Sequence, residues 1–518
     1  MEPAKCPHCG KPLTAPTPAP GRRRGRLALL TLVLALVVAG AVGLAVWAHL
    51  NRDSDNPLCF TAKSDGATVG LELYTERLKK DEEIAEAKRQ APKLEFEISR
   101  DGQKWREWKQ PWNVELRHKG DRAYVRSKSV NPSFGKYDEK DDFDDDLVGT
   151  YYGFAIDGEV AASGDVTTLL DRAGRRSLAG FPHAFANLFS DCPGLVAAPE
   201  LPATVLSNGC YRNMFEGCSA LKTTPRLPAT KLAEDCYRGM FMKCAALTAA
   251  PELPATKLAD GCYASMFSDC EALKTAPRLP ATELKEGCYD GMFMNCGSLT
   301  AAPELPATQL ADRCYSGMFR NCHALTTAPR LPATELKEAC YDAMFMDCSS
   351  LTVAPALPAT KLAYGSCMGM FYGCSELTAA PARLPATKLA ERCYDKMFYD
   401  CEKLTAAPEL PATELAKDCY FGMFHGCAAL TVAPKLPATK LAPRCYAVMF
   451  SRTALTAAPE LPATELPKGC YAQMFYGCEK LTAAPTIPAA AKRPGVDVDK
   501  IFDPDFVGDD DSEDDADE

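Results

Sequence analysis

The residues best suited to chemistry in this sequence are its cysteines, of which it has 25. Two of them, Cys6 and Cys9, are separated by two residues and followed by Gly10, a spacing that suits two ligands of a tetrahedral zinc ion. Zinc in such sites takes four ligands, and residues 1–21 contain no second CxxC pair. The pair therefore predicts either a zinc ion shared between two chains or a segment without metal.

The motif Cys6-Pro7-His8-Cys9-Gly10 resembles one knuckle of a zinc ribbon. The resemblance implies zinc as the only candidate cofactor, with Cys6 and Cys9 as its ligands. A shared zinc ion, together with close packing of the transmembrane helix predicted below, would give a homodimer through the N-terminal stub and that helix. It covers only the stub at residues 1–21, whose second half is a Pro-rich linker.

Twenty-two further cysteines recur in a pattern, one before Tyr and one after Met-Phe, eight residues apart. On a helix this separation is about 12 Å, too long for a disulfide within one repeat. In an oxidising compartment bridges could join successive repeats, from Cys192–Cys210 through Cys427–Cys445, leaving Cys470 and Cys478 over. We favour buried free thiols, which pack as small apolar groups. A thiol count under denaturing, non-reducing conditions distinguishes the two.

Catalysis is not expected from the remaining side chains. The chain has six histidines, of which His323 and His425 occupy unrelated outward positions of the repeat. No Ser-His-Asp, paired-acid or phosphate-loop arrangement is present, and the repeat cysteines lie among Met, Phe and Tyr, without a group that would stabilise a thiolate. The formal charge of −10 argues against nucleic acid as a partner. We therefore predict that the protein is not an enzyme.

An apolar run at residues 27–47 is long enough to cross a bilayer as a helix. Arg22, Arg23, Arg24 and Arg26 precede it, and the positive-inside bias retains such residues in the cytoplasm. We predict a basic flank and transmembrane helix at residues 22–50, with a cytoplasmic N-terminus and all later residues exported. A cleaved signal peptide is the alternative, but its apolar region would be shorter.

Residues 56–175 are predicted to form a small β-rich domain of the β-sandwich type. Residues 94–98 alternate in polarity and Asp101-Gly102 follows as a hairpin turn. A second hairpin is predicted around residues 118–121, a further strand at 151–156, and a charged helical insertion at 74–90.

A tandem repeat fills the rest of the chain, and it decides the fold. We predict a solenoid at residues 176–490 and an acidic, disordered tail at 491–518. Successive copies are 26 residues apart, with one step of 27 and one of 25. The leucine of the recurring LPAT motif marks about eleven units: Leu201, Leu227, Leu253, Leu279, Leu305, Leu331, Leu357, Leu384, Leu410, Leu436 and Leu461.

Within one unit, Leu258, Cys262, Met266 and Cys270 lie on one side of a helix if the residues advance by 100° each. The preceding LTAAPEL segment is predicted to return the chain as a short strand, limited to about 3–4 paired residues by its prolines. The fold class predicted is therefore an α/β solenoid. Its core should contain the Met-Phe pairs of the repeats: Met214, Phe215, Met240, Phe241, Met266, Phe267, Met292, Phe293, Met318 and Phe319.

The pattern around Phe267, Cys270 and Leu273 resembles the BspA-like leucine-rich repeats of bacterial surface proteins. The resemblance covers residues 181–488 and implies a leucine-rich-repeat array that mediates adhesion or protein–protein contact at a bacterial cell surface. Two departures, the 26-residue unit and a proline on the strand, put the regularity of the concave sheet in doubt.

The residue between Pro and Leu alternates in charge through the first six units, and Ala356, Arg383, Glu409, Lys435 and Glu460 follow in the later ones. Neighbouring coils would place these side chains side by side, so opposite signs would favour one register, by about 0.2–1 kcal/mol per pair. A recognition stripe for a partner is the alternative function of this ladder. Its members are Glu200, Arg226, Glu252, Arg278, Glu304, Arg330, Glu409, Lys435 and Glu460.

We therefore predict a single-pass protein of the bacterial cell membrane that binds a protein or other cell-surface ligand through its exported repeats. The alternative is a passive spacer or envelope scaffold without a dedicated ligand, which the near-identity of the units favours. Exposed aromatic residues clustered on one face would favour binding.

Overall fold

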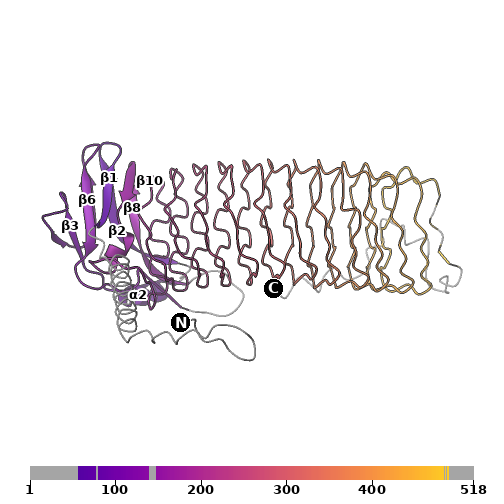
Figure 1. Ribbon diagram of the computed structural model, residues 1–518, viewed down its shortest axis with the longest axis horizontal. Coiled ribbons are helices and arrows are strands. Elements are labelled where there is room, and N and C mark those ends of the chain that lie inside the picture. Colours follow the sequence, from indigo (N-terminus) through magenta and orange to yellow (C-terminus); the bar gives the residue numbers. More distant parts are fainter. Residues whose placement is uncertain (1–55, 77–79, 139–147, 484, 486, 489–518) are drawn as a thin grey trace, which may run out of the picture. The chain divides into compact units, whose positions relative to one another are not determined.

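The computed structural model describes residues 56–76, 80–138, 148–483, 485 and 487–488 (Figure 1). The described residues all belong to one compact unit. Cys6, Cys9, the predicted membrane span and the acidic tail all lie outside the described residues. Within the described ranges, no helix has the length and apolar character needed to cross a membrane.

Two β-sheets open the described part of the chain. The first has the strand order β10-β9-β1-β6-β3-β4 and the second the order β5-β2-β8-β7. The strands are β1 (Leu58–Ala62), β2 (Ala67–Glu76), β3 (Phe96–Ser99), β4 (Arg106–Trp108), β5 (Trp112–Leu116), β6 (Arg122–Ser127), β7 (Gly135–Asp138), β8 (Val148–Asp157), β9 (Val160–Ser163) and β10 (Leu195–Ala197); a 3-10 helix η1 spans Val166–Leu169.

The sheets pack face to face through aromatic side chains, as the sandwich prediction requires. Phe60 of β1 contacts Phe154 of β8 with ring centroids 4.9 Å apart, and Phe96 of β3 contacts Trp112 of β5 at 5.3 Å. The hairpin predicted at Asp101-Gly102 is confirmed, since β3 and β4 pair antiparallel across it. The second hairpin is wrong: the turn at residues 118–121 joins β5 and β6, which belong to different sheets.

The charged insertion contains the one α-helix of the described residues, α2 (Asp81–Arg89). The helix is shorter than the predicted 74–90 because β2 continues to Glu76, paired with β8 along its length. Three acidic residues in the first turn and two basic residues in the last match the helix dipole, and no side chain of α2 is buried.

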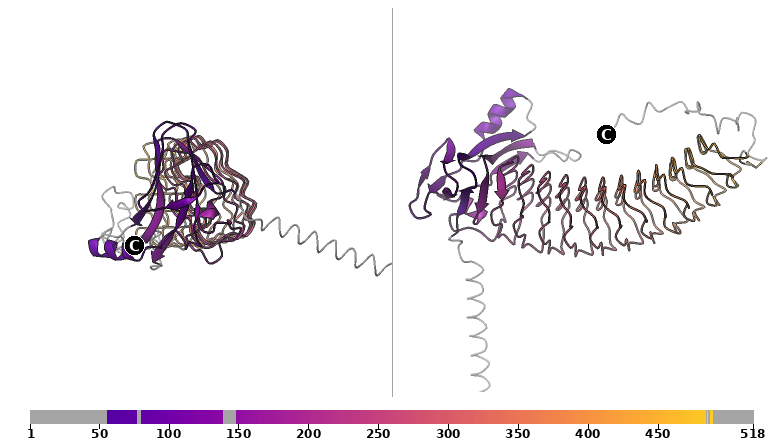
Figure 2. Two further views of the ribbon diagram at one scale, coloured as in Figure 1. Left: turned by 90° about the vertical axis from the view of Figure 1, so that its left-hand side faces the viewer. Right: turned by 90° about the horizontal axis from the view of Figure 1, so that it is seen from above.

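Twelve coils follow, 26 residues apart except for one step of 27 and one of 25, and each is stacked on the one before (Figure 2). The helix predicted in each coil is wrong, and with it the α/β class. In the segment that begins at Gly261, alternate amides donate to the next coil, as from Tyr263 to Cys288 O at 3.1 Å. The amides between them close turns within the coil, as from Met266 to Tyr263 O at 3.2 Å. These chain-to-chain bonds replace the internal bonds of a helix.

A left-handed backbone residue at every fourth position enforces this path. In all twelve coils three residues have positive φ, from His183, Asn187 and Asp191 in the first to Gly469, Gln473 and Gly477 in the last. Gly, Asn and Asp occupy most of these positions because they tolerate this conformation best. Their recurrence at intervals of four was a visible signal against a helix.

Val448 is the least suitable of these residues, because it is β-branched and adopts φ 59°. We expect Val448→Asn to raise the free energy of unfolding by about 1 kcal/mol, the relief of left-handed strain. The denaturation midpoint measures it. Val432→Asn is the matched control, since Val432 is 70 % exposed with no positive φ. Equal midpoints for both variants would contradict the strain argument.

The returning segments are extended and contact their neighbours through single parallel bridges. Equivalent residues face each other, as in Ala249↔Thr275, Glu283↔Gln309 and Val353↔Ala379. The 26-residue register predicted from sequence is therefore present, while continuous strands are not. The two prolines of a coil, such as Pro251 and Pro254 between the bridge positions Ala249 and Lys257, remove the amide donors that a longer strand would need.

The Met-Phe pairs of the predicted core are all fully buried. The phenylalanines form a continuous stack from Phe189 to Phe475 with centroids 5.4–5.9 Å apart. A tyrosine stack runs beside it from Tyr211 to Tyr341 and resumes at Tyr394, because Cys367 occupies the tyrosine position between them.

The sheets and the coils share one core. Phe154 of β8 takes the place of a preceding coil: its ring stacks on Phe189 at 5.0 Å and its carbonyl accepts the Cys192 thiol at 2.9 Å. Strand β10, at the end of the first coil, also pairs with β9. The sandwich thus caps the first coil and shields its apolar side from water.

Candidate functional site

The repeat cysteines are the first candidate. All 23 described cysteines are free and buried. The thiol after each Met-Phe pair donates to the carbonyl of the phenylalanine in the preceding coil, for example from Cys270 Sγ to Phe241 O at 3.1 Å. This hydrogen bond needs a protonated thiol, so these cysteines hold neighbouring coils together without a covalent bond.

Burial also removes the reactivity of these thiols. It raises the pKa of Cys270 to about 12, and that of Cys288 to about 12. A thiolate is the reactive form. The site is therefore structural and not nucleophilic.

We expect iodoacetamide at pH 8 to leave the repeat cysteines of the native protein unmodified over hours and to modify them in guanidinium chloride. Mass spectrometry of the two samples counts the alkylated residues. Blocked cysteines in the denatured, unreduced sample would instead indicate disulfides between coils.

The charge ladder is exposed at all nine of its positions. In the described part of the chain, a single ion pair involves it, between Arg383 Nε and Glu409 Oε2 at 4.0 Å. A second column, the residue after LPAT, pairs more closely, as in Lys388–Glu414 at 3.4 Å. The structure brings these charges into register but leaves most of the ladder facing solvent.

A different column distinguishes the coils from one another. We call the residue after each core phenylalanine the post-Phe column. Methionine and short or charged residues occupy it in the first half of the array, and tyrosine or histidine in the second half, except at Ser451. Its members from the second coil on are Glu216, Met242, Ser268, Met294, Arg320, Met346, Tyr372, Tyr399, His425, Ser451 and Tyr476.

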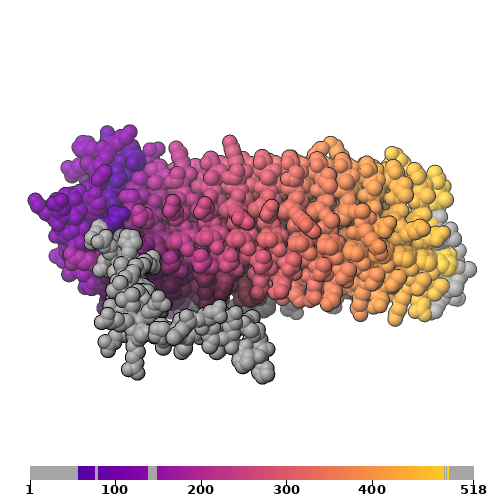
Figure 3. All heavy atoms as spheres, in the orientation of Figure 1, coloured from indigo at the N-terminus to yellow at the C-terminus, as the bar shows by residue number. Residues whose placement is uncertain are grey.

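Three consecutive members form a partly exposed stack of rings. Tyr372 and Tyr399 lie 4.7 Å apart at an angle of 2°, and Tyr399 and His425 lie 4.3 Å apart at 14°. Farther along the column, Tyr476 is 39 % exposed. Burial, with Arg452 nearby, lowers the pKa of His425, which favours its neutral form. The space-filling view shows rows of side chains that run along the face of the array drawn there (Figure 3).

A second aromatic group lies in the same coils. Phe421 is half-buried, with Lys396 Nζ 5.5 Å and Arg444 Cζ 4.9 Å from its ring centroid. The arrangement is a cation–π cluster. We refer to this cluster and the Tyr372–Tyr399–His425 stack, which lie in overlapping coils, together as the ring surface. Rings beside cations are the side chains that hot spots of protein interfaces use most.

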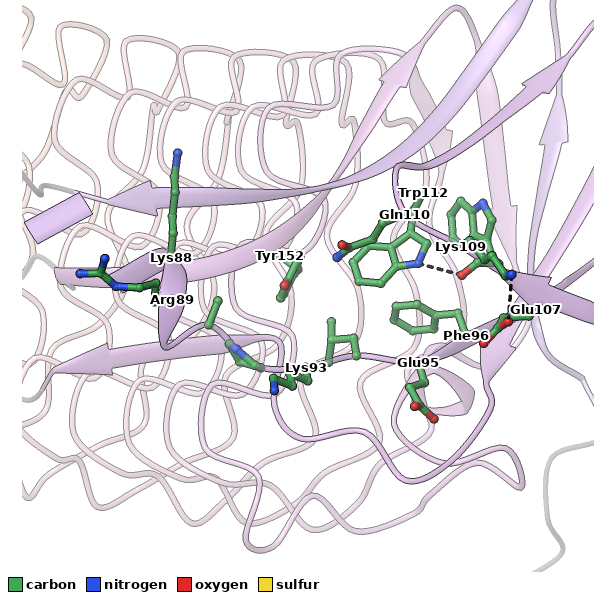
Figure 4. Close-up of a pocket in the computed structure, with 14 residues that line it drawn as sticks. Lys88, Arg89, Lys93, Glu95, Phe96, Glu107, Lys109, Gln110, Trp112 and Tyr152 are labelled. Carbon is green, nitrogen blue, oxygen red and sulfur yellow. Dashed lines mark hydrogen bonds and ion pairs between the residues drawn. The ribbon is translucent and has the colours of Figure 1, made fainter. Parts of the chain in front are cut away.

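A cavity of about 490 Å³ lies between α2 and the sheets. Its inner wall is formed by Phe96, Trp112 and Tyr152, while Lys88, Arg89 and Lys93 lie around it (Figure 4). The Trp112 Nε1–H already donates to Trp108 O at 2.9 Å, and the rings are at most 7 % exposed. The three aromatic residues therefore belong to the hydrophobic core. A ligand in the cavity would contact mainly the cationic side chains around it.

Three acids along the array are placed unusually. Asp290, Asp342 and Asp395 follow the tyrosine position in alternate coils, and burial raises the pKa of each. Arg313 Nη2 lies 3.4 Å from Asp290 Oδ2, and Arg392 Nε lies 3.0 Å from Asp395 Oδ2. Asp342 takes part in no ion pair within the described residues, and its pKa rises to about 6.

Among the residues that the structure describes, no group of three or more His, Cys, Asp or Glu side chains could hold a metal ion. Comparison with known proteins shows no family, since no family model, curated protein or solved structure matches the chain.

The post-Phe column was not predicted from the sequence because its residues vary from coil to coil. That variation within near-identical units was itself the signal.

Proposed function

We propose that the chain is a membrane-anchored, exported leucine-rich-repeat protein that binds a protein or glycan partner at a bacterial cell surface. The observation that carries the proposal is the partly exposed ring stack Tyr372–Tyr399–His425. A passive spacer needs identical coils and a continuous core, and has no use for aromatic side chains facing water. Their grouping in successive coils supports a dedicated contact surface.

The charge ladder supports the same proposal only weakly, because its alternating signs present little net field to a partner. The ring surface offers more, since aromatic residues beside cations provide large contact area with few rotatable bonds. We therefore place the contact on the second half of the array.

The test compares two triple variants in binding to immobilised envelope glycans and matrix proteins. Tyr372→Ser, Tyr399→Ser and His425→Ser together are expected to weaken binding at least tenfold, because interface aromatics contribute about 2 kcal/mol or more each. The matched control, Met242→Ser, Met294→Ser and Arg320→Ser, changes the same column in the first half of the array and should bind as the native chain does. Equal affinities for both variants, or no binding by the native chain, would favour the spacer.

A further inference from the structure

Four arginines surround one open hollow on the sheets, with a volume of about 760 Å³. They come from four separate places: the end of β3, strand β4, the end of β5 and the start of β6. The remaining lining includes Asn113, Glu115 and Asp121. The four residues, which we call the arginine hollow, are Arg100, Arg106, Arg117 and Arg122.

The carboxylates present do not neutralise this hollow. Glu115 pairs with Arg117 at 3.2 Å, and Asp121 accepts the backbone amide of His118 at 3.0 Å. Arg100 donates to the backbone carbonyl of Glu115 at 2.7 Å, which adds no negative charge. Within the described residues neither Arg106 nor Arg122 forms an ion pair with an acid. Guanidinium groups gathered in this way repel one another, and a bound oxyanion would relieve that repulsion.

The distribution of charged residues along the chain indicates which anion the arginine hollow binds. Residues 91–130, which contain the hollow, have ten Lys and Arg against six Asp and Glu. Residues 503–518 have ten Asp and Glu and no basic residue, which equals the whole formal charge of −10. The rest of the chain is thus formally neutral in sum. Residues 138–146 form a second acidic run, with seven acids and one lysine, but segment 503–518 has the larger number of carboxylates and no basic residue.

We infer that the arginine hollow binds the acidic segment 503–518 of a second copy of this chain. Each guanidinium can take a carboxylate through two parallel hydrogen bonds, so a run of acids can engage several arginines at once. The interaction joins the sheets of one copy to the C-terminal segment of another. It goes beyond the proposed function and is independent of the ring surface.

A second copy is favoured over the same chain because of distance. The phenylalanine stack takes eleven steps of 5.4–5.9 Å from Phe189 to Phe475, so the array is about 60 Å long. The 15 residues from 488 to 503 span at most about 54 Å when fully extended. Asp503 therefore cannot return to the sheets of its own chain. The acids at residues 509–518 lie 21–30 residues beyond 488 and could span at most about 76–108 Å. A flexible chain of that length has an end-to-end distance of only about 23–33 Å, so reaching the sheets of the same chain would require a strongly stretched segment.

The test uses the full chain in detergent solution and two variants. The hollow variant carries Arg106→Gln, Arg117→Gln and Arg122→Gln, and the tail variant ends after Gly508. We expect sedimentation velocity to show salt-sensitive association of the native chain, at least tenfold weaker for either variant alone. In a one-to-one mixture, the acidic segment of the hollow variant can bind the intact arginine hollow of the tail variant. Association between the two variants should therefore be restored. No recovery in the mixture would overturn the inference, as would association that is unchanged in both variants.

A labelled peptide of residues 503–518 measures the same contact directly by fluorescence anisotropy with the tail variant. Removing the three arginines should weaken its binding at least tenfold. The charge-matched control is Lys222→Gln, Lys231→Gln and Lys257→Gln, three exposed lysines of the array, which should change affinity less than twofold. Equal losses in the two triple variants, or tighter binding of inorganic phosphate than of the peptide, would overturn the assignment.

Discussion

Phe293→Ala is expected to lower the free energy of unfolding by about 3–5 kcal/mol, the cost of a large cavity in a core that cannot collapse around it. Phe293 is fully buried and stacks on Phe267 and Phe319, at 5.7 Å on each side. Its backbone hydrogen bonds to the next coil do not depend on the ring. One of them runs from the Phe293 amide to Met318 O at 2.9 Å. The backbone hydrogen bonds between coils should therefore remain, while the side-chain packing around residue 293 is lost.

Urea denaturation and limited proteolysis measure the effect together. Because each coil contacts mainly its neighbours, the variant should unfold in more than one step and be cleaved first near residue 293. Met294→Ala is the matched control, since Met294 is the adjacent, only half-buried residue, and should cost less than about 1 kcal/mol. A loss as large for Met294→Ala as for Phe293→Ala would contradict the ladder of buried rings.

Asp342→Asn is expected to stabilise the protein at pH 7 by up to about 3 kcal/mol, at 1.36 kcal/mol for each unit by which the pKa is raised. Burial is the main cause of the rise of the Asp342 pKa to about 6 from 3.8; Asp290 and Asp395 add to it, while Arg313 and Arg320 oppose it. A carboxyl with a raised folded pKa favours folding in its protonated form. That contribution is complete below pH 3.8 and is lost as the pH rises to about 6.

Denaturation midpoints between pH 4 and pH 8 measure this slope. The native chain should lose stability across the window more steeply than Asp342→Asn, since the amide cannot ionise. Glu304→Gln removes one carboxylate from the exposed ladder and serves as the control. If the native chain and Asp342→Asn keep the same pH dependence, Asp342 is ionised at no cost and its surroundings are more polar than the structure indicates.

Sequence reasoning identified the repeat, its register and the inward Met-Phe pairs, because a strict 26-residue period leaves identical units little choice but to stack. It failed on the path of the chain within a unit. Leu258, Cys262, Met266 and Cys270 fit a helix at 100° per residue, but side chains four apart also share a side in a run of turns that repeats every four residues. Apolar spacing does not separate these two conformations.

The backbone preferences did separate them. Gly261 and Asp269, with Ser265 between, occupy left-handed positions that a helix interior would not use. The candidate contact surface was harder to predict, because residues such as Tyr372 and His425 lie outside the repeat consensus. Their significance appears only when the coils place them in one column.

The stack of coils also acts as a ruler. Each 26-residue unit advances the array by one ring spacing of 5.4–5.9 Å, and the extra residue near Arg383 leaves the step from Phe371 to Phe398 at 5.4 Å. Small insertions at the proline-rich edge therefore change a loop and not the length. Gain or loss of a whole unit, the natural product of unequal exchange between near-identical DNA segments, would lengthen or shorten the array in equal increments while every internal contact is reproduced.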